Sequence, residues 1–125
     1  MSHNKNLAAS FKNAFRGLIS VYTTQRNAKI HLGMTLIVIA VGFLLKISAI
    51  EWLAVLFAIG FVWASECFNT ALEKLTDLVS PQYNDLAKIS KDAAAAGVLI
   101  AAISAAAIGL IIFLPKITSL LFHQS

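Results

Sequence analysis

This sequence has little charge. Charged residues occupy 13% of its 125 positions, about half the roughly 25% typical of soluble domains, whereas hydrophobic residues occupy 58%. Mean hydropathy is +0.78. A small domain buries a smaller share of its surface than a large one, so one core cannot absorb this much apolar sequence. The composition argues against a soluble monomer, excludes a disordered chain, and favours a single-domain polytopic membrane protein spanning residues 1–125.

Cysteine and histidine are also scarce. The single cysteine, Cys67, excludes an internal disulfide and a cysteine-based zinc site. The histidines at positions 3, 31 and 123 lack metal-ligand spacing. Acidic residues are absent from the first fifty positions, which carry six basic ones. A basic stretch beside apolar segments favours anionic headgroups or phosphates. Without an aromatic platform or a DNA-binding motif, we expect no nucleic-acid partner.

An amphipathic helix is predicted over about residues 5–28. Apolar side chains recur there at helical spacing and would form one face: Leu7, Phe11, Phe15, Leu18 and Tyr22. Basic residues lie off that face, so we expect the helix to lie in the membrane interface. Packing of the same face on protein is the alternative. Polar interruptions argue against a signal peptide.

Three membrane spans are predicted, over residues 30–50, 52–72 and 93–115, each near the 20 apolar residues that a span needs. A short connection makes the first two an antiparallel hairpin. The connection over residues 74–92 is longer and polar, with a turn at Ser80-Pro81. Eight basic residues against two place the N-terminus and this connection in the cytoplasm and the C-terminus outside.

Small residues recur at every fourth position of the third span: Gly97, Ala101, Ala105 and Gly109. Small residues on one helical face let backbones approach closely in lipid. Three thin helices leave little room for a shielded site of their own. We therefore expect assembly with other copies of this chain.

The second span ends in a column of acidic residues. Glu66, Glu73 and Asp77 lie within about 20° of one line on a helix, with Asn69 beside them. An ionisable group inside a span costs roughly 2.5–3.5 kcal/mol on insertion scales, so Glu66 indicates function. Carboxylates suit Mg²⁺ and its phosphate ligands, and one at this depth can serve as a general base. A solvated helix end is the alternative.

Lys91 and Asp92 directly precede the third span. A helix N-terminus beside a lysine attracts phosphate. Together with the acidic column, this pair predicts a Mg²⁺–polyphosphate site at the cytoplasmic surface. The chain has neither a P-loop nor a protein-kinase motif.

At these residues the chain resembles the prokaryotic diacylglycerol kinase family, the small integral-membrane lipid kinases that include undecaprenol kinase. Residues 66–77, ECFNTALEKLTD, resemble the family's E-x-x-N-[ST]-A-[IL]-E-x-x-x-D signature. Residues 91–94, KDAA, resemble its K-D-x-A segment. Arg26-Asn27 with Ile30-His31 resembles the R-N-x-x-I-H stretch of the undecaprenol-kinase-like branch. The resemblance covers roughly residues 10–115.

The resemblance implies an all-α bacterial cytoplasmic-membrane protein: a homotrimer of protomers with one surface helix and three spans, and with composite sites between protomers. It implies phosphoryl transfer from MgATP to a lipid alcohol. By the same resemblance Glu66 is the general base, Glu73 a metal ligand, and Asn69 and Asp77 supporting polar residues. The implied ATP-binding residues are Asn13, Gln82, Tyr83, Asn84, Lys91 and Asp92.

One position departs from the family pattern. The family has a second metal-binding glutamate directly before R-N-x-x-I-H, and here Gln25 stands there. Its amide oxygen can ligate Mg²⁺ but contributes no charge.

Four functions are compatible with these residues. The leading one is a lipid kinase acting on diacylglycerol to give phosphatidic acid, and the second is an undecaprenol kinase with the same mechanism. A small ion-coupled transporter using Glu66 is less favoured, because the acidic column extends beyond the span through Glu73 and Asp77. Gln25 leaves room for a non-catalytic assembly partner.

Overall fold

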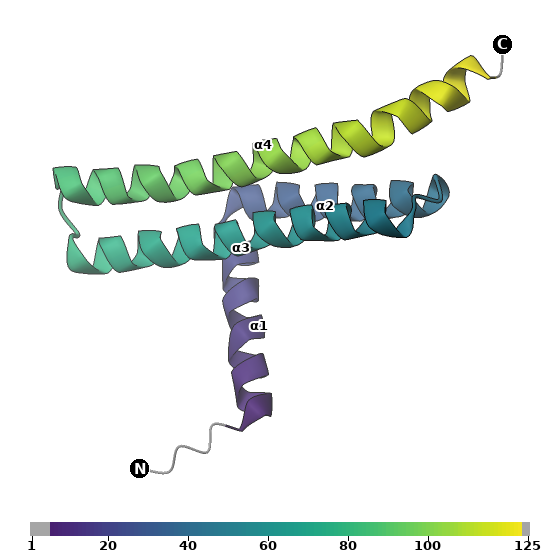
Figure 1. The fold of residues 1–125 in the computed structure, drawn as a ribbon. Helices are drawn as coiled ribbons and strands as arrows, with labels where there is room; N and C mark the ends of the chain where they lie inside the picture. The colour runs from purple at the N-terminus through teal and green to yellow at the C-terminus, as the bar shows by residue number, and fades with distance from the viewer. Residues whose placement is uncertain (1–5, 124–125) are drawn as a thin grey trace.

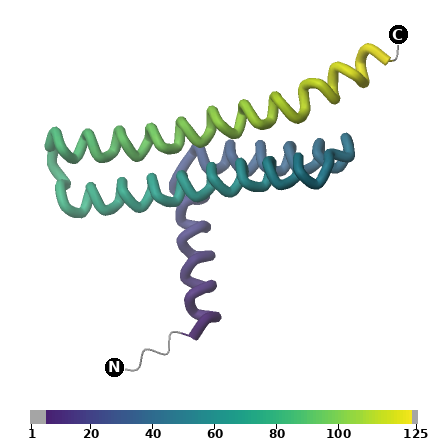
Figure 2. The backbone as a smooth tube through the Cα atoms, viewed as in Figure 1, coloured from purple at the N-terminus to yellow at the C-terminus, as the bar shows by residue number. Residues whose placement is uncertain are grey.

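The computed structural model describes residues 6–123, which form four helices. They are α1 (Leu7–Thr24), α2 (Arg26–Leu44), α3 (Ala49–Val79) and α4 (Asp85–Phe122). Helices α2, α3 and α4 run alongside one another, and α1 projects away from them (Figures 1 and 2). The predicted all-helical architecture is confirmed.

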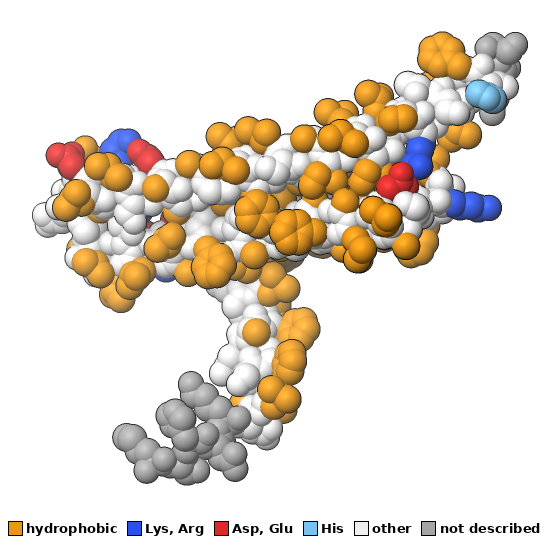
Figure 3. Space-filling view, viewed as in Figure 1, with side chains coloured by type: hydrophobic (Ala, Val, Ile, Leu, Met, Phe, Trp, Pro, Cys, Tyr) orange, Lys and Arg blue, Asp and Glu red, His pale blue; other side chains and the backbone are white. Residues whose placement is uncertain are grey.

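Helices α2, α3 and α4 are each long and apolar enough to cross a membrane. Orange hydrophobic side chains cover most of the visible face of this bundle, and charged side chains gather toward its two ends (Figure 3). Such a distribution fits a bilayer, because lipid leaves charged groups without solvation in the middle of a span. The three apolar helices predicted from sequence are therefore present.

The α2–α3 turn begins earlier than predicted. Helix α2 ends at Leu44, and Lys46, expected inside the first span, lies in the turn with a φ of 49°. Helix α3 then begins with a capping box, in which the Ser48 hydroxyl accepts from the Glu51 N–H and the Glu51 carboxylate accepts from the Ser48 N–H. Both orphan amides are satisfied, which fixes where α3 starts.

The polar connection predicted over residues 74–92 is mostly helical. Helix α3 continues to Val79, and α4 already begins at Asp85, where the Asn84 side chain accepts from two backbone N–H groups. The predicted turn at Ser80-Pro81 is confirmed. Leu, Glu, Lys and Ala favour helix whether or not they lie in lipid. The polar residues therefore end the apolar stretches but not the helices α3 and α4.

Helix α4 also continues past Pro115, where the sequence predicts the end of the third span. Proline lacks the N–H that would bond four residues back, so it bends a helix. The C-terminal part of α4 diverges from α3 in Figure 1. The Thr118 hydroxyl donates to the carbonyls of Leu114 and Pro115 at 3.0 Å. The proline therefore interrupts the helix without stopping it.

Packing within the chain is closest between α3 and α4. Ala101, from the predicted small-residue stripe, is fully buried at 0% exposure. Gly97 and Gly109 of the same stripe face open space instead: a Cβ added at either would meet no described atom within 4 Å. The stripe is thus only partly used inside one protomer.

The α2–α3 hairpin is tightest at Gly42. A Cβ there would lie 2.8 Å from Cη2 of Trp52, closer than side chains approach. The Trp52 ring also packs against Phe43, with centroids 4.9 Å apart. Beside this turn the Lys116 ammonium lies 3.1 Å from the Glu51 carboxylate, which links the start of α3 to α4.

Gln25 separates α1 from α2. Its backbone is extended, with φ −106° and ψ 119°, so the helix predicted over residues 5–28 ends at Thr24. Val21 and Ala28 are buried on either side of this corner. Farther out, Phe11 and Phe15 of α1 are 60% and 63% exposed. The corner holds Gln25 against the bundle while the rest of α1 points away.

Candidate active site

The deepest polar group is the Glu66 carboxylate, which is 2% exposed. Helix α3 places it toward α2, where the His31 Nε2 atom lies 2.9 Å from Glu66 Oε1. The two atoms are in contact, but their geometry is not that of a hydrogen bond, so Oε1 has no hydrogen-bond donor among residues 6–123. The Thr70 hydroxyl donates to the Glu66 carbonyl instead. One oxygen of a buried carboxylate therefore keeps an unused acceptor site.

Glu73 lies on the same face of α3, nearer the predicted cytoplasmic end. The Gln25 amide donates from Nε2 to one carboxylate oxygen at 3.0 Å, and the Asn69 amide donates from Nδ2 to the other at 3.3 Å. Two amides therefore hold the carboxylate without adding charge. Gln25 reaches it because the corner between α1 and α2 brings residue 25 against α3.

These side chains line one small cavity of about 310 Å³. Its polar wall consists of Gln25, Asn27, His31, Glu66, Asn69 and Glu73. Its opposite wall is apolar and comes from α4: Ala95, Val98, Leu99 and Ala102. The predicted base and the predicted metal ligands thus share one cavity, which we call the polar cavity.

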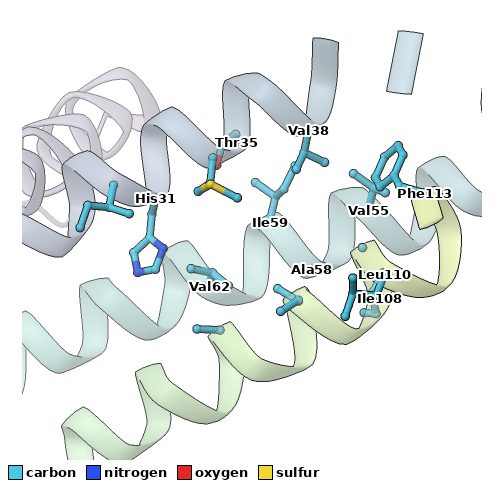
Figure 4. A pocket seen from close by; sticks show the side chains of 16 residues that line it. His31, Thr35, Val38, Val55, Ala58, Ile59, Val62, Ile108, Leu110 and Phe113 are labelled. Atoms are coloured by element: carbon cyan, nitrogen blue, oxygen red, sulfur yellow. The ribbon is translucent and has the colours of Figure 1, made fainter. Parts of the chain in front are cut away.

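A second cavity of about 600 Å³ runs between α2, α3 and α4 and is lined almost entirely by apolar side chains. We call it the apolar groove. Figure 4 shows His31 at one end of it and Phe113 at the other. Ile30, His31 and Ala102 line both cavities. The apolar groove and the polar cavity therefore adjoin.

The remaining acidic and basic candidates lie beyond the polar cavity. Asp77 forms an ion pair with Lys91, and Asp92 forms one with Lys88. All four side chains are substantially exposed. The structure thus brings Asp77 and Lys91 together at the same end of α3 and α4, one turn past Glu73.

The loop between α3 and α4 holds three more candidates. Asn84 caps α4, and the Gln82 carbonyl accepts from the Ser80 hydroxyl. The Tyr83 hydroxyl donates to the Asp85 carboxylate at 2.8 Å, and this hydrogen bond raises the pKa of Tyr83 above its ordinary value. All three loop residues are exposed, and none lines the polar cavity.

Asn13 lies apart from every other candidate. It is exposed on α1, which projects away from the bundle (Figure 1). Neither cavity includes it. Within one protomer, therefore, Asn13 does not join the site.

Sequence reasoning missed His31 as a site residue. The three histidines lack metal-ligand spacing, yet His31 contacts Glu66 and lines both cavities. The signal available was its place in R-N-x-x-I-H, at the start of the first span predicted over residues 30–50. A polar ring at that depth requires a partner just as Glu66 does.

The donor set fits a magnesium ion held by few protein ligands. Within residues 6–123, no three His, Cys, Asp or Glu side chains gather closely enough to bind a metal alone. Mg²⁺ is usually bound by one or two carboxylates together with substrate phosphates. Glu73 supplies a carboxylate, and the buried Asn69 Oδ1 atom beside it has no hydrogen-bond donor within that range. The Gln25 amide would have to turn its oxygen toward the ion.

The fold and the site together define a class. Three helices long and apolar enough to cross a membrane enclose an apolar groove, and a polar cavity with the buried Glu66 carboxylate adjoins that groove, an arrangement that suits a protein acting on a lipid at the membrane. The chain belongs to the prokaryotic diacylglycerol kinase family, which it matches over residues 12–113.

Two relatives are similar over most of the chain. An undecaprenol kinase of Bacillus subtilis is 41% identical over 108 residues, covering 86% of this chain and 88% of the relative. A diacylglycerol kinase of Synechocystis is 41% identical over 117 residues, covering 93% of this chain and 67% of the relative. The chain is therefore a lipid kinase, and its family implies ATP as the phosphoryl donor.

Proposed function

We propose that this kinase transfers the γ-phosphoryl group of MgATP to the hydroxyl of diacylglycerol and gives phosphatidic acid. The observation that carries the proposal is the position of Glu66, buried in the polar cavity, which shares Ile30, His31 and Ala102 with the apolar groove. In this proposal the lipid chain lies in the apolar groove, and its hydroxyl arrives beside a carboxylate oxygen that has no hydrogen-bond donor among the described residues. Undecaprenol is the second acceptor, favoured by R-N-x-x-I-H and the similarity to the Bacillus subtilis protein.

In the proposed step Glu66 accepts the proton of the lipid hydroxyl. The hydroxyl oxygen then forms a bond to the γ-phosphorus, the bond from that phosphorus to the β–γ bridging oxygen breaks, and ADP leaves. Glu73, with Asn69 and Gln25, would hold Mg²⁺, which neutralises phosphate charge when bound. Lys91 and Asp92, with the loop residues Gln82, Tyr83 and Asn84, would bind the nucleotide at the open end of α3 and α4.

We also propose a homotrimer with composite sites. Helix α1 leaves its own bundle, so Asn13 could serve the site of a neighbouring copy in the interface (Figure 1). The open space at the exposed Gly97 would let a second backbone approach α4, whereas Gly109 lines the apolar groove. The exposed apolar face of α1, with Lys12 and Arg16 off it, suits the cytoplasmic membrane surface. The C-terminus would then lie outside.

A side-by-side assay tests the acceptor. Purified protein in mixed micelles receives labelled MgATP with either diacylglycerol or undecaprenol, and the lipid phase is extracted and counted. We expect label in phosphatidic acid, with at least a tenfold preference over undecaprenyl phosphate. The reverse preference would replace the first acceptor with the second. Label in neither lipid would refute both proposed acceptors.

A further inference from the structure

His31 is the one titratable side chain of residues 6–123 that both cavities share. It belongs to α2, whereas the base and the metal ligand both belong to α3. In the part of the chain that the structure describes, no other basic side chain lies within ion-pair distance of the Glu66 carboxylate. Its own side chain is 19% exposed, so the contact is shielded from water on most sides.

The Glu66 carboxylate has few other restraints. The hydroxyl of Thr70 is used by the Glu66 backbone carbonyl, and both Asn69 and Gln25 donate to Glu73. Among the described residues, none donates a hydrogen bond to Glu66 Oε1, so the rotation of the carboxyl group depends on its contact with His31. A general base must nevertheless be held in hydrogen-bond reach of the proton that it accepts.

We infer that His31 is the positioning residue for the lipid acceptor: its imidazole orients the Glu66 carboxylate and forms the boundary that the acceptor hydroxyl must reach from the apolar groove. This inference rests on the proposed function, because it assigns a task to the neighbour of the proposed base. The ring lines both cavities, together with Ile30 and Ala102, so the head of a lipid whose chain lies in the groove would approach Glu66 beside it.

In this role His31 acts on the lipid acceptor and not on MgATP. Glu73 and its two amides line the polar cavity but not the groove, and their hydrogen bonds do not depend on the imidazole. Loss of the imidazole should therefore disturb the acceptor hydroxyl and Glu66 and leave MgATP binding nearly unchanged. A merely structural histidine would affect both substrates together.

The test replaces the ring nitrogens in two ways and measures kcat and both KM values in the micelle assay, with whichever lipid the wild type phosphorylates. His31→Phe keeps an aromatic ring without a nitrogen, whereas His31→Gln keeps an N–H group of similar reach. We expect His31→Phe to lower kcat/KM for the lipid by about 10–100-fold, the usual loss when an orienting neighbour is removed. The KM for MgATP should stay within about twofold, and His31→Gln should recover much of the loss.

His123→Phe is the matched control, because His123 is exposed at the end of α4 and lines neither cavity. Wild-type kinetics in His31→Phe would overturn the inference. So would an equal rise in both KM values with a lowered unfolding temperature, or a His31→Gln protein as impaired as His31→Phe. Glu66→Gln in the same assay distinguishes the two levels: an active Glu66→Gln protein refutes the proposed base, whereas an inactive one beside an active His31→Phe refutes only the role of His31.

Discussion

Gln25 gives the polar cavity one negative charge fewer than a glutamate at the same position would. Where the family pattern has glutamate, the amide nitrogen of Gln25 donates to Glu73. Two carboxylates at that distance would repel each other without a cation between them. In the structure the Glu73 carboxylate is therefore held by two neutral amide donors, without a second carboxylate beside it.

Gln25→Glu should add the negative charge that the glutamine side chain lacks. With two carboxylates as ligands, we expect a lower Mg²⁺ concentration for half-maximal activity and a higher turnover, because ligand charge drives the affinity for hard cations. Thermal unfolding supplies a second readout: the variant should melt below the wild type in chelator and gain more from added Mg²⁺. A variant with equal or poorer activity and no added metal response would mean that another group completes the site.

Glu66→Gln should nearly abolish turnover and leave the fold intact. Glutamine keeps the size of the buried side chain but cannot accept the hydroxyl proton, so we expect a loss of about 10²–10⁴ in kcat. Circular dichroism and size-exclusion profiles should match the wild type. Turnover near the wild-type rate would remove Glu66 from the role of base.

Glu73→Ala should act on the metal side. We expect a large rise in the Mg²⁺ concentration needed for activity, with little change in the KM for lipid, because Glu73 lines the polar cavity and not the groove. A magnesium titration of kcat checks this. An unchanged requirement would exclude Glu73 as a ligand.

At the scale of single residues, the sequence predicted which side chains of α3 lie together, but not which residues from other parts of the chain contact them. Glu66, Asn69 and Glu73 share a helical face, and the helix period alone places them together. His31 and Gln25 come from other elements, and their distances to α3 depend on the corner at residue 25, where the chain leaves helical geometry. A periodic pattern carries no information about such a corner, so it did not predict the contact between His31 and Glu66, although the place of His31 in R-N-x-x-I-H marked it as a candidate.

At the scale of elements, the α2–α3 hairpin depends on the absence of a side chain at Gly42. Alanine there would press a Cβ against the Trp52 ring. We expect Gly42→Ala to cost about 1–3 kcal/mol, the usual penalty of overpacking. Gly33→Ala is the matched control in the same helix, because no described atom lies within 4 Å of its Cβ position. Unfolding in detergent should separate the two variants, and equal midpoints would contradict the tight packing.

The helix ends show what apolar runs can predict. Hydropathy predicted all three apolar helices, but it predicted only their apolar stretches and not the polar residues by which α3 and α4 extend beyond them. The true ends depend on Ser48, Asn84 and the turn at Pro81, which are capping and backbone features. Pro115 led to a further error: the sequence predicted that the third span ends there, but α4 continues through this proline to Phe122.

At the scale of the whole molecule, a complementation experiment tests whether sites are shared between copies. Asn13→Arg and Glu66→Gln should each be inactive if Asn13 serves the site of a neighbour. Co-expressed at equal levels, they should restore about a quarter of wild-type activity, since random mixing gives that share of sites both intact residues. Activity no higher than the sum of the separate variants would place each complete site within one protomer.

The seven-residue separation of Glu66 and Glu73 has a consequence for how lipid preference can change. Both stand on one continuous helix, so about 10.5 Å of axial rise between them is set by backbone geometry. Inserting a single residue would rotate one by about 100° away from the other. Relatives that differ in lipid preference are therefore expected to keep this seven-residue spacing and to differ in the cavity-lining residues of α2 and α4. Two relatives with different acceptors in their names are equally similar to this chain, at 41% identity, as expected if the lipid can be exchanged while the chemistry is inherited unchanged.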